Sequence, residues 1–87
     1  MDYIVKQQDT TIVIEQTKKE IKNNIIEQFV TLRKAKKLTQ EDIAVRTGIA
    51  RSNIARIESG KYVPTIEVLT KLAFALDMKL DISFVDK

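Results

Sequence analysis

Two arginines near the middle of the chain stand where side chains could read the edges of nucleic-acid bases. Arg51 and Arg56 belong to a predicted short helix whose inward side carries Ile54 and Ile57. A guanidinium group can donate two parallel hydrogen bonds to guanine. The chemistry expected on this helix is therefore recognition of base edges. Its outward positions are Arg51, Ser52, Ala55 and Arg56.

Positive charge gathers around this predicted helix. Residues 33–61 hold eight basic and three acidic residues, a net charge of +5, whereas all 87 residues together carry +3. The remainder of the chain is thus net acidic. Neutralising phosphates is what such a local concentration of Lys and Arg favours. The lysines at 34, 36 and 37 allow two interpretations, a solvated helix end or phosphate steering.

Catalysis is not expected from this composition. The chain contains no cysteine and no histidine, which removes disulfides, thiolate nucleophiles, imidazole bases and every ordinary zinc site. Carboxylates and lysines are present, but no motif assembles them at a nucleophile, a metal or a phosphate loop. We therefore expect no enzyme activity, no metal and no cofactor.

Capping signals place the candidate residues on two short helices joined by a turn. Thr39 can cap a helix that Gly48 ends, and the next helix, 51–59, is closed by Gly60. A further helix starts after Thr65, again a capping residue. Its predicted apolar stripe is Ile66, Leu69, Leu72, Ala73 and Leu76, and Phe74 beside it is expected in the core. Two short helices around such a turn have the spacing of a helix-turn-helix unit.

Before this unit, residues 18–36 have helical periodicity, with one predicted apolar stripe of Ile21, Ile25, Phe29 and Leu32. The pattern fits either one helix or a turn at Asn23–Asn24 followed by a helix from near Ile25. The β-branched segments 3–5 and 10–14 favour strands, so residues 1–17 are expected to form an N-terminal arm or strand segment. Further expected roles for this segment are a share in a dimer sheet or a toxin-binding surface.

The last segment, 79–87, is expected to be a C-terminal strand because apolar and polar residues alternate in it. Its apolar members are Leu80, Ile82 and Phe84. Such a strand could pair with its copy in a second subunit, as a dimerisation strand, or with the N-terminal segment internally. Residues 18–78 between the two end segments form the expected helix-turn-helix domain. The fold class is mainly α, with four to five helices and short terminal β-strands.

Three motifs in order carry a resemblance to a known family. They are L-T-Q-E-x-I-A from Leu38, G-I-x-R-S-x-I-x-R-I-E-x-G from Gly48, and P-T-x-x-x-L-x-x-L-A from Pro64. From about Ile25 to Met78 the chain resembles the Xre/Cro-type helix-turn-helix domain of phage repressors. The resemblance implies a lambda-repressor-like fold and binding to operator DNA. One departure is Ala50, where the family commonly has Ser or Thr as the cap of its recognition helix.

The resemblance also implies roles for single residues. The base-facing positions of the family match Arg51, Ser52, Ala55 and Arg56. The positions that touch the sugar-phosphate backbone match Thr39, Gln40, Asn53, Lys61 and Tyr62. Arg33 and Glu58 match an ion pair that ties the first helix to the end of the recognition helix. The resemblance implies that this last pair is structural.

The tail is similar to that of antitoxins of the HipB and HigA kind. We therefore expect a homodimeric repressor of a palindromic operator, and specifically the antitoxin and autorepressor of a type II toxin–antitoxin module with a protein toxin as partner. One alternative is a stand-alone phage-type or stress regulator without a toxin. Another is a protein-interaction module that does not bind DNA. The longest apolar run, residues 72–76, is far too short to span a membrane, so the expected location is cytoplasmic.

Overall fold

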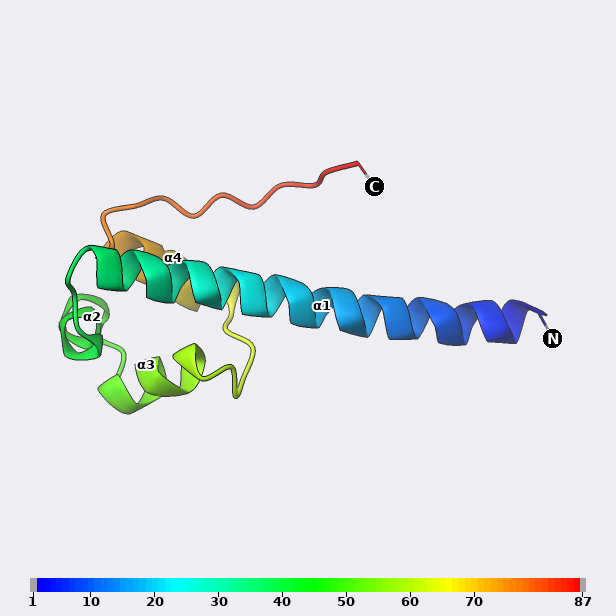
Figure 1. Cartoon of the computed structure of the whole chain (residues 1–87), viewed down its shortest axis with the longest axis horizontal. Helices are drawn as coiled ribbons and strands as arrows, with labels where there is room; N and C mark the ends of the chain where they lie inside the picture. Colours follow the sequence, from blue (N-terminus) through cyan, green and yellow to red (C-terminus); the bar gives the residue numbers. More distant parts are fainter. Residues whose placement is uncertain (1, 87) are drawn as a thin grey trace.

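Four helices form the part of the protein that the computed structural model describes, which is the backbone of residues 2–86 and the side chains from Thr10 onward. Their bounds are α1 Asp2–Ala35, α2 Gln40–Thr47, α3 Arg51–Glu58 and α4 Ile66–Ala75. Within residues 2–86 no strand is formed. Helix α1 is the long spine, with α2 and α3 on one side of it and the tail on the other (Figure 1).

Helix α1 runs without a break through the segment expected to be an arm or strand. The strand prediction for residues 3–5 and 10–14 was therefore wrong, and the domain boundary expected at residue 17 falls inside a helix. Asn24 does not cap a new helix, because its side-chain oxygen accepts a hydrogen bond from Gln28 within α1 at 3.1 Å. Local β-branched composition is a weak preference that a continuous hydrogen-bonded helix can override. Met1 lies outside the described residues.

The first short helix, α2, begins with a complete capping box. The Asp42 amide donates to the Thr39 hydroxyl at 3.0 Å, and the Thr39 amide donates to the Asp42 carboxylate at 2.8 Å. At the other end Gly48 adopts φ 76°, and its amide donates to the Ala44 carbonyl. Glycine suits this left-handed position because it has no Cβ. The predicted start and end of α2 are confirmed.

Helix α4 closes the domain against α2. Thr65 caps it, its hydroxyl accepting from the Val68 amide at 3.1 Å. Arg46, in the last turn of α2, donates to the Ala75 carbonyl at 2.8 Å. That bond satisfies one of the carbonyl groups left free at the end of a helix. Helix α2 packs against both α3 and α4, so the three short helices form one body beside α1.

The core lies where this body meets the second half of α1. Its fully buried side chains are Ile43, Ile54, Ile57 and Leu72. Ile26 and Phe29 are the buried core residues of α1, and Ala75 and Leu76 are core residues at the end of α4. These eight apolar residues supply the main hydrophobic stabilisation of the domain.

Three apolar side chains expected to be buried are exposed instead. Ile21, Ile66 and Phe74 have exposed fractions of 62%, 66% and 78%. Ile26, which the predicted stripe omitted, is buried. The helical period of α1 was correct, but the face that meets the core is rotated toward Ile26. A helix pattern gives which residues share a face, and the packing decides which face is covered.

The tail after α4 forms neither helix nor strand in residues 79–86, so the predicted C-terminal strand is not seen there. A strand requires a neighbour to accept and donate its backbone hydrogen bonds, and no second strand exists within residues 2–86. The tail runs back alongside α1 toward its N-terminal half (Figure 1). None of the helices in the described part is long and apolar enough to cross a membrane.

Candidate nucleic-acid interface

Helix α3 has one buried side and one side open to solvent. Ile54 and Ile57 have exposed fractions of 0% and 1%. Three of the predicted base-reading residues, Arg51, Ser52 and Arg56, are exposed, and so is Asn53 among the predicted backbone contacts; Ala55 is half-buried. The helix therefore presents a row of polar side chains and has its position fixed by the isoleucines behind them.

The beginning of α3 has no side-chain cap. Ala50 occupies the cap position with φ −58° and ψ 141°, and no side chain accepts a hydrogen bond there. The amides of Asn53 and Ile54 both donate to the Ala50 carbonyl, at 2.9 and 3.0 Å. Helix α3 thus starts at Arg51 as predicted, although the capping hydroxyl common in the family is missing.

The end of α3 is held by a buried ion pair. Arg33 donates from Nε and Nη2 to the two oxygens of Glu58 at 2.7 and 2.9 Å, and from Nη1 to the Leu38 carbonyl at 2.8 Å. Both side chains of the pair are only about a tenth exposed, at 10% and 9%. Gln40 donates to the same carboxylate at 3.1 Å. The Glu58 carboxylate therefore joins α1, α2 and α3 at one point.

A basic groove lies beside this junction, at the start of α2. Its lining includes two of the predicted phosphate contacts, Thr39 and Gln40, together with Arg51 of α3. Lys34 and Lys37 also line it, together with one carboxylate, that of Glu41. Cationic side chains next to the N-terminal end of a helix favour an anion such as a phosphate. Lys34 also lies in the last turn of α1, so both interpretations of the lysine run, a solvated helix end and phosphate steering, remain predictions.

The other predicted backbone contacts follow α3. Lys61 is exposed and Tyr62 is half-buried. The Arg56 guanidinium lies 5.9 Å from the centre of the Tyr62 ring, a cation–π arrangement. Stacking of this kind restricts the rotamers of Arg56 and orders a long side chain that a base edge could then bind.

Lys22 is a residue of this region that no sequence signal identified. Its amine donates to the Gly60 carbonyl at 3.1 Å and so ties α1 to the turn that follows α3. The residues are 38 positions apart in the chain, and neither the periodicity of α1 nor a motif links them. Contacts between a lysine and a distant main-chain carbonyl depend on the tertiary fold alone.

The start of α2 also has one perturbed acid. The Thr39 amide, and secondly the Thr39 hydroxyl, hydrogen-bond to Asp42 and lower the pKa of its carboxyl below the ordinary value. Asp42 is therefore ionised at neutral pH, in the first turn of α2. This negative charge interacts favourably with the positive end of the α2 dipole, but it does not attract an anionic ligand.

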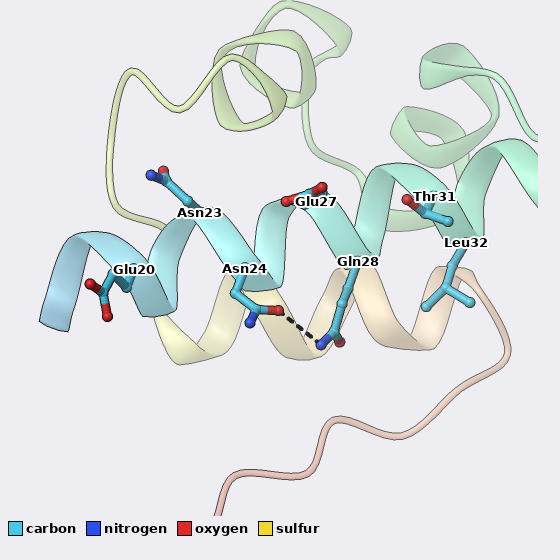
Figure 2. A pocket seen from close by; sticks show the side chains of 7 residues that line it. All are labelled: Glu20, Asn23, Asn24, Glu27, Gln28, Thr31 and Leu32. Atoms are coloured by element: carbon cyan, nitrogen blue, oxygen red, sulfur yellow. Dashed lines mark hydrogen bonds between the residues drawn. The ribbon is translucent and has the colours of Figure 1, made fainter.

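A second open groove lies along α1 and has a different chemistry. Figure 2 shows its lining, which comes entirely from α1 and includes Glu20 and Glu27 but no base-reading or phosphate-contacting candidate. Two carboxylates make it unsuitable for a phosphate. In the described part of the chain, no group of three or more potential metal ligands comes together.

The fold and the exposed surface of α3 define a helix-turn-helix domain. The model for the Helix-turn-helix family of the Xre/Cro type matches residues 31–82, more than half of the chain. The chain belongs to this family, as its three motifs indicated.

Several curated relatives align with the same region. The chain is 40% identical over 48 residues to an HTH-type transcriptional regulator of Methanocaldococcus jannaschii, covering 55% of this chain and 73% of the relative. It is 39% identical over 57 residues to the cryptic phage CTXphi transcriptional repressor RstR of Vibrio cholerae, covering 66% and 51%. The ImmF control region 10 kDa protein of Bacillus phage phi105 is 32% identical over 50 residues, covering 58% and 56%. No solved structure gives a significant match.

Proposed function

We propose that this protein is a sequence-specific, double-stranded DNA-binding transcriptional repressor that reads the major groove with α3. The observation that carries the proposal is the exposed polar row of α3 on a helix whose back is buried and whose end is ion-paired. In the proposal Arg51, Ser52, Ala55 and Arg56 face the bases. A well-placed bidentate contact discriminates between bases by about 1–3 kcal/mol.

The proposed phosphate contacts surround this row. Thr39 and Gln40 lie in the basic groove at the start of α2, and Asn53, Lys61 and Tyr62 lie along and after α3. Contacts to phosphates fix the position of the protein on the duplex without reading its sequence. Repression then follows by occlusion, because a protein seated on a promoter excludes polymerase. Since the ligand is genomic DNA, the proposed place of action is the cytoplasm.

We further propose that the repressor is a homodimer bound to a palindromic operator, with residues 18–78 as the DNA-binding unit. A single recognition helix reads few base pairs, and two-fold dimers read half-sites one helical turn apart. Leu80, Ile82 and Phe84 of the tail are the proposed dimerisation strand. Ile82 and Phe84 are exposed, with fractions of 64% and 106%, so the tail has apolar side chains to offer a second copy.

The substitution Arg56→Ala tests the readout. We expect it to weaken binding to the chain's own promoter fragment much more than binding to a scrambled fragment, measured by gel shift or anisotropy at fixed salt. Lys71→Ala is the control, because it removes one positive charge on α4 and leaves the readout intact. Equal losses on both DNA fragments would show that Arg56 only contacts phosphate.

An antitoxin role is the second candidate, favoured by the apolar surface that the domain leaves open. Phe74 on α4 is 78% exposed and Phe84 in the tail is fully exposed, which fits a protein partner. Co-expression with the neighbouring open reading frame, followed by purification through a tag on this chain, tests the role. A chain that purifies alone supports a stand-alone phage-type or stress regulator.

A non-DNA-binding interaction module is the remaining alternative. Gel shifts at about 50 mM salt, where phosphate contacts are strong, separate it from the repressor. A shift with the promoter fragment that weakens as salt rises supports the repressor. The absence of any shift at low salt supports the interaction module.

A further inference from the structure

The segment of α1 from Thr10 to Ile21 lies outside the core of the helix-turn-helix body. Every residue from Thr10 to Ile21 is exposed, and the residues that α1 contributes to the core begin only at Ile25. The segment contains five consecutive β-branched residues, 10–14. Such residues are poor helix formers, and an isolated helix of this length is marginal in water. This segment of α1 therefore requires a packing partner.

One side of the exposed segment is apolar and joins an apolar corner of the domain. Ile14 and Ile21 are seven positions apart, two helical turns, so they lie on the same side. Their exposed fractions are 52% and 62%. Ile21 lines a groove together with Val63, Ile66 and Ile82, which brings α1, the start of α4 and the tail together. The apolar side is thus continuous with the proposed dimerisation strand.

We propose that this side of α1 packs against the same side of α1 in a second copy, with the two helices antiparallel and crossing near residues 17 and 18. In that crossing Ile14 contacts the partner's Ile21, and Ile21 contacts the partner's Ile14. The proposal rests on the proposed function, because the second copy is the one that reads the other half of the operator. It adds the interface and its register.

The position of α3 along α1 supports this register. Lys22 contacts Gly60 just after α3, and Lys37 shares a groove with Arg51 at the start of α3. The middle of α3 therefore lies beside about residue 30, some 12 residues from the crossing. At about 1.5 Å per residue, the two copies of α3 are then roughly 36 Å apart along the helix direction. Half-sites one helical turn apart require about 34 Å.

Two charged residues lie beside the apolar side, and the spacing of α3 gives the direction of the pair. Glu15 and Lys22 lie on the same flank of the apolar side, again seven positions apart. Within one copy Glu15 is ion-paired with Lys18 at 3.4 Å and Lys22 donates to the Gly60 carbonyl at 3.1 Å, so a contact between Glu15 and the partner's Lys22 would only add to these bonds. In a parallel pair the two copies of α3 would lie at the same height along α1, so no separation along the helix direction would arise to match the half-sites.

Cysteine cross-linking tests the crossing directly, because the chain has no cysteine of its own. We expect Ile14→Cys and Ile21→Cys to stay uncross-linked when each is oxidised alone. When the two variants are mixed, a disulfide-linked heterodimer should form, since only then do the two Cα atoms come within about 7 Å. Cross-linking of each variant alone would indicate a parallel pair and overturn the proposal. Failure of the mixture would overturn it as well.

A charge substitution provides the second measurement. We expect Ile14→Glu to raise the dimer dissociation constant at least tenfold in analytical ultracentrifugation. Ile12→Glu is the matched control, because Ile12 is 55% exposed but points to the other side of α1, and it should leave the dimer unchanged. Circular dichroism checks that both variants keep the fold of the domain.

The outcomes separate this inference from the proposed function. If Ile14→Glu stays dimeric and a chain lacking residues 79–87 becomes monomeric, the α1 crossing is wrong and a DNA-binding dimer built on the tail remains. If the wild-type chain shifts no promoter DNA while the mixed cysteine variants cross-link, the crossing is correct and the proposed DNA-binding function is wrong.

Discussion

The carboxylate of Glu58 accepts hydrogen bonds from two different side chains in the candidate interface. It accepts two hydrogen bonds from Arg33 and one from Gln40. Buried ion pairs recover little beyond their desolvation cost, but breaking one leaves an unpaired buried charge. The pair therefore fixes the geometry of α3 relative to α1 and α2 more than it adds to stability.

Removing Arg33 alone should consequently be costly. We expect Arg33→Met to lower the free energy of unfolding by about 3–5 kcal/mol, because Glu58 is left buried without its partner. Urea denaturation measures the change. The double variant Arg33→Met with Glu58→Leu should recover part of the loss.

Comparison with an exposed ion pair tests whether burial is the reason for this loss of stability. Lys71 and Glu67 lie 3.8 Å apart on α4, with side chains 49% and 80% exposed. Lys71→Met should change the free energy of unfolding by less than about 0.5 kcal/mol. Equal losses for Arg33→Met and Lys71→Met would mean that burial of the first pair has no energetic consequence.

Among the elements, the short helices were predictable because their ends carry local chemistry. A threonine hydroxyl at a cap position and a glycine at a left-handed position act within a few residues, so Thr39, Gly48 and Thr65 marked their boundaries in the sequence. The first half of α1 was not predictable in this way. Its β-branched residues favour strand only if a neighbouring strand exists, and the chain provides none within residues 2–86.

Burial was predictable for α3 and less so for α1 and α4. Ile54 and Ile57 had a polar row opposite them, so only one side could face inward. In α4 both sides are apolar, and the exposure of Ile66 and Phe74 depends on where α1 and the tail lie. The roles of Arg51 and Arg56 toward bases remain predictions, because exposure determines which side chains can reach a duplex but not which base each one contacts.

The capping box of α2 gives this element a dependence on pH. Since the folded-state pKa of Asp42 is lowered, its contribution to stability is present above the unfolded pKa and is lost as pH falls through the folded pKa. We expect Asp42→Ala to be less stable than wild type at pH 7, with the difference shrinking below about pH 4. Thermal melts at several pH values measure it.

A second variant separates the two causes of this shift. Thr39→Ala removes the hydroxyl but keeps the main-chain amide, which is the larger cause of the lowered pKa. We expect it to lose about 1 kcal/mol of stability through the cap and to keep most of its acid sensitivity. A flat pH profile in Thr39→Ala would contradict the importance of the amide.

At the scale of the whole molecule, the distribution of charge is more informative than the net charge. The net charge of +3 is small, but the basic groove and the exposed row belong to the start of α2 and to α3. These two helices lie on one side of α1 and the tail lies on the other (Figure 1). In the proposed function, the first side binds the polyanion and the exposed apolar side chains of the other side bind proteins.

The salt dependence of DNA binding should test the proposed polyanion-binding side. We expect the logarithm of the association constant for promoter DNA to fall linearly with the logarithm of salt concentration. Lys61→Ala should reduce the slope by about one, because one phosphate contact is lost. An unchanged slope would remove Lys61 from the contacts. Titrations by fluorescence anisotropy at several salt concentrations provide the slope for the wild type and for Lys61→Ala.

The division of α3 into a buried back and an exposed row has a consequence for how such regulators diversify. The side chains that hold the helix in place, Ile54, Ile57 and Glu58, are not the ones that meet the operator in the proposed function. After a gene duplication, one copy can therefore exchange Arg51, Ser52 or Arg56 and acquire a different operator without disturbing the core. Two paralogues can separate their regulatory targets by a few surface substitutions, and a designer can redirect this domain by the same exchange.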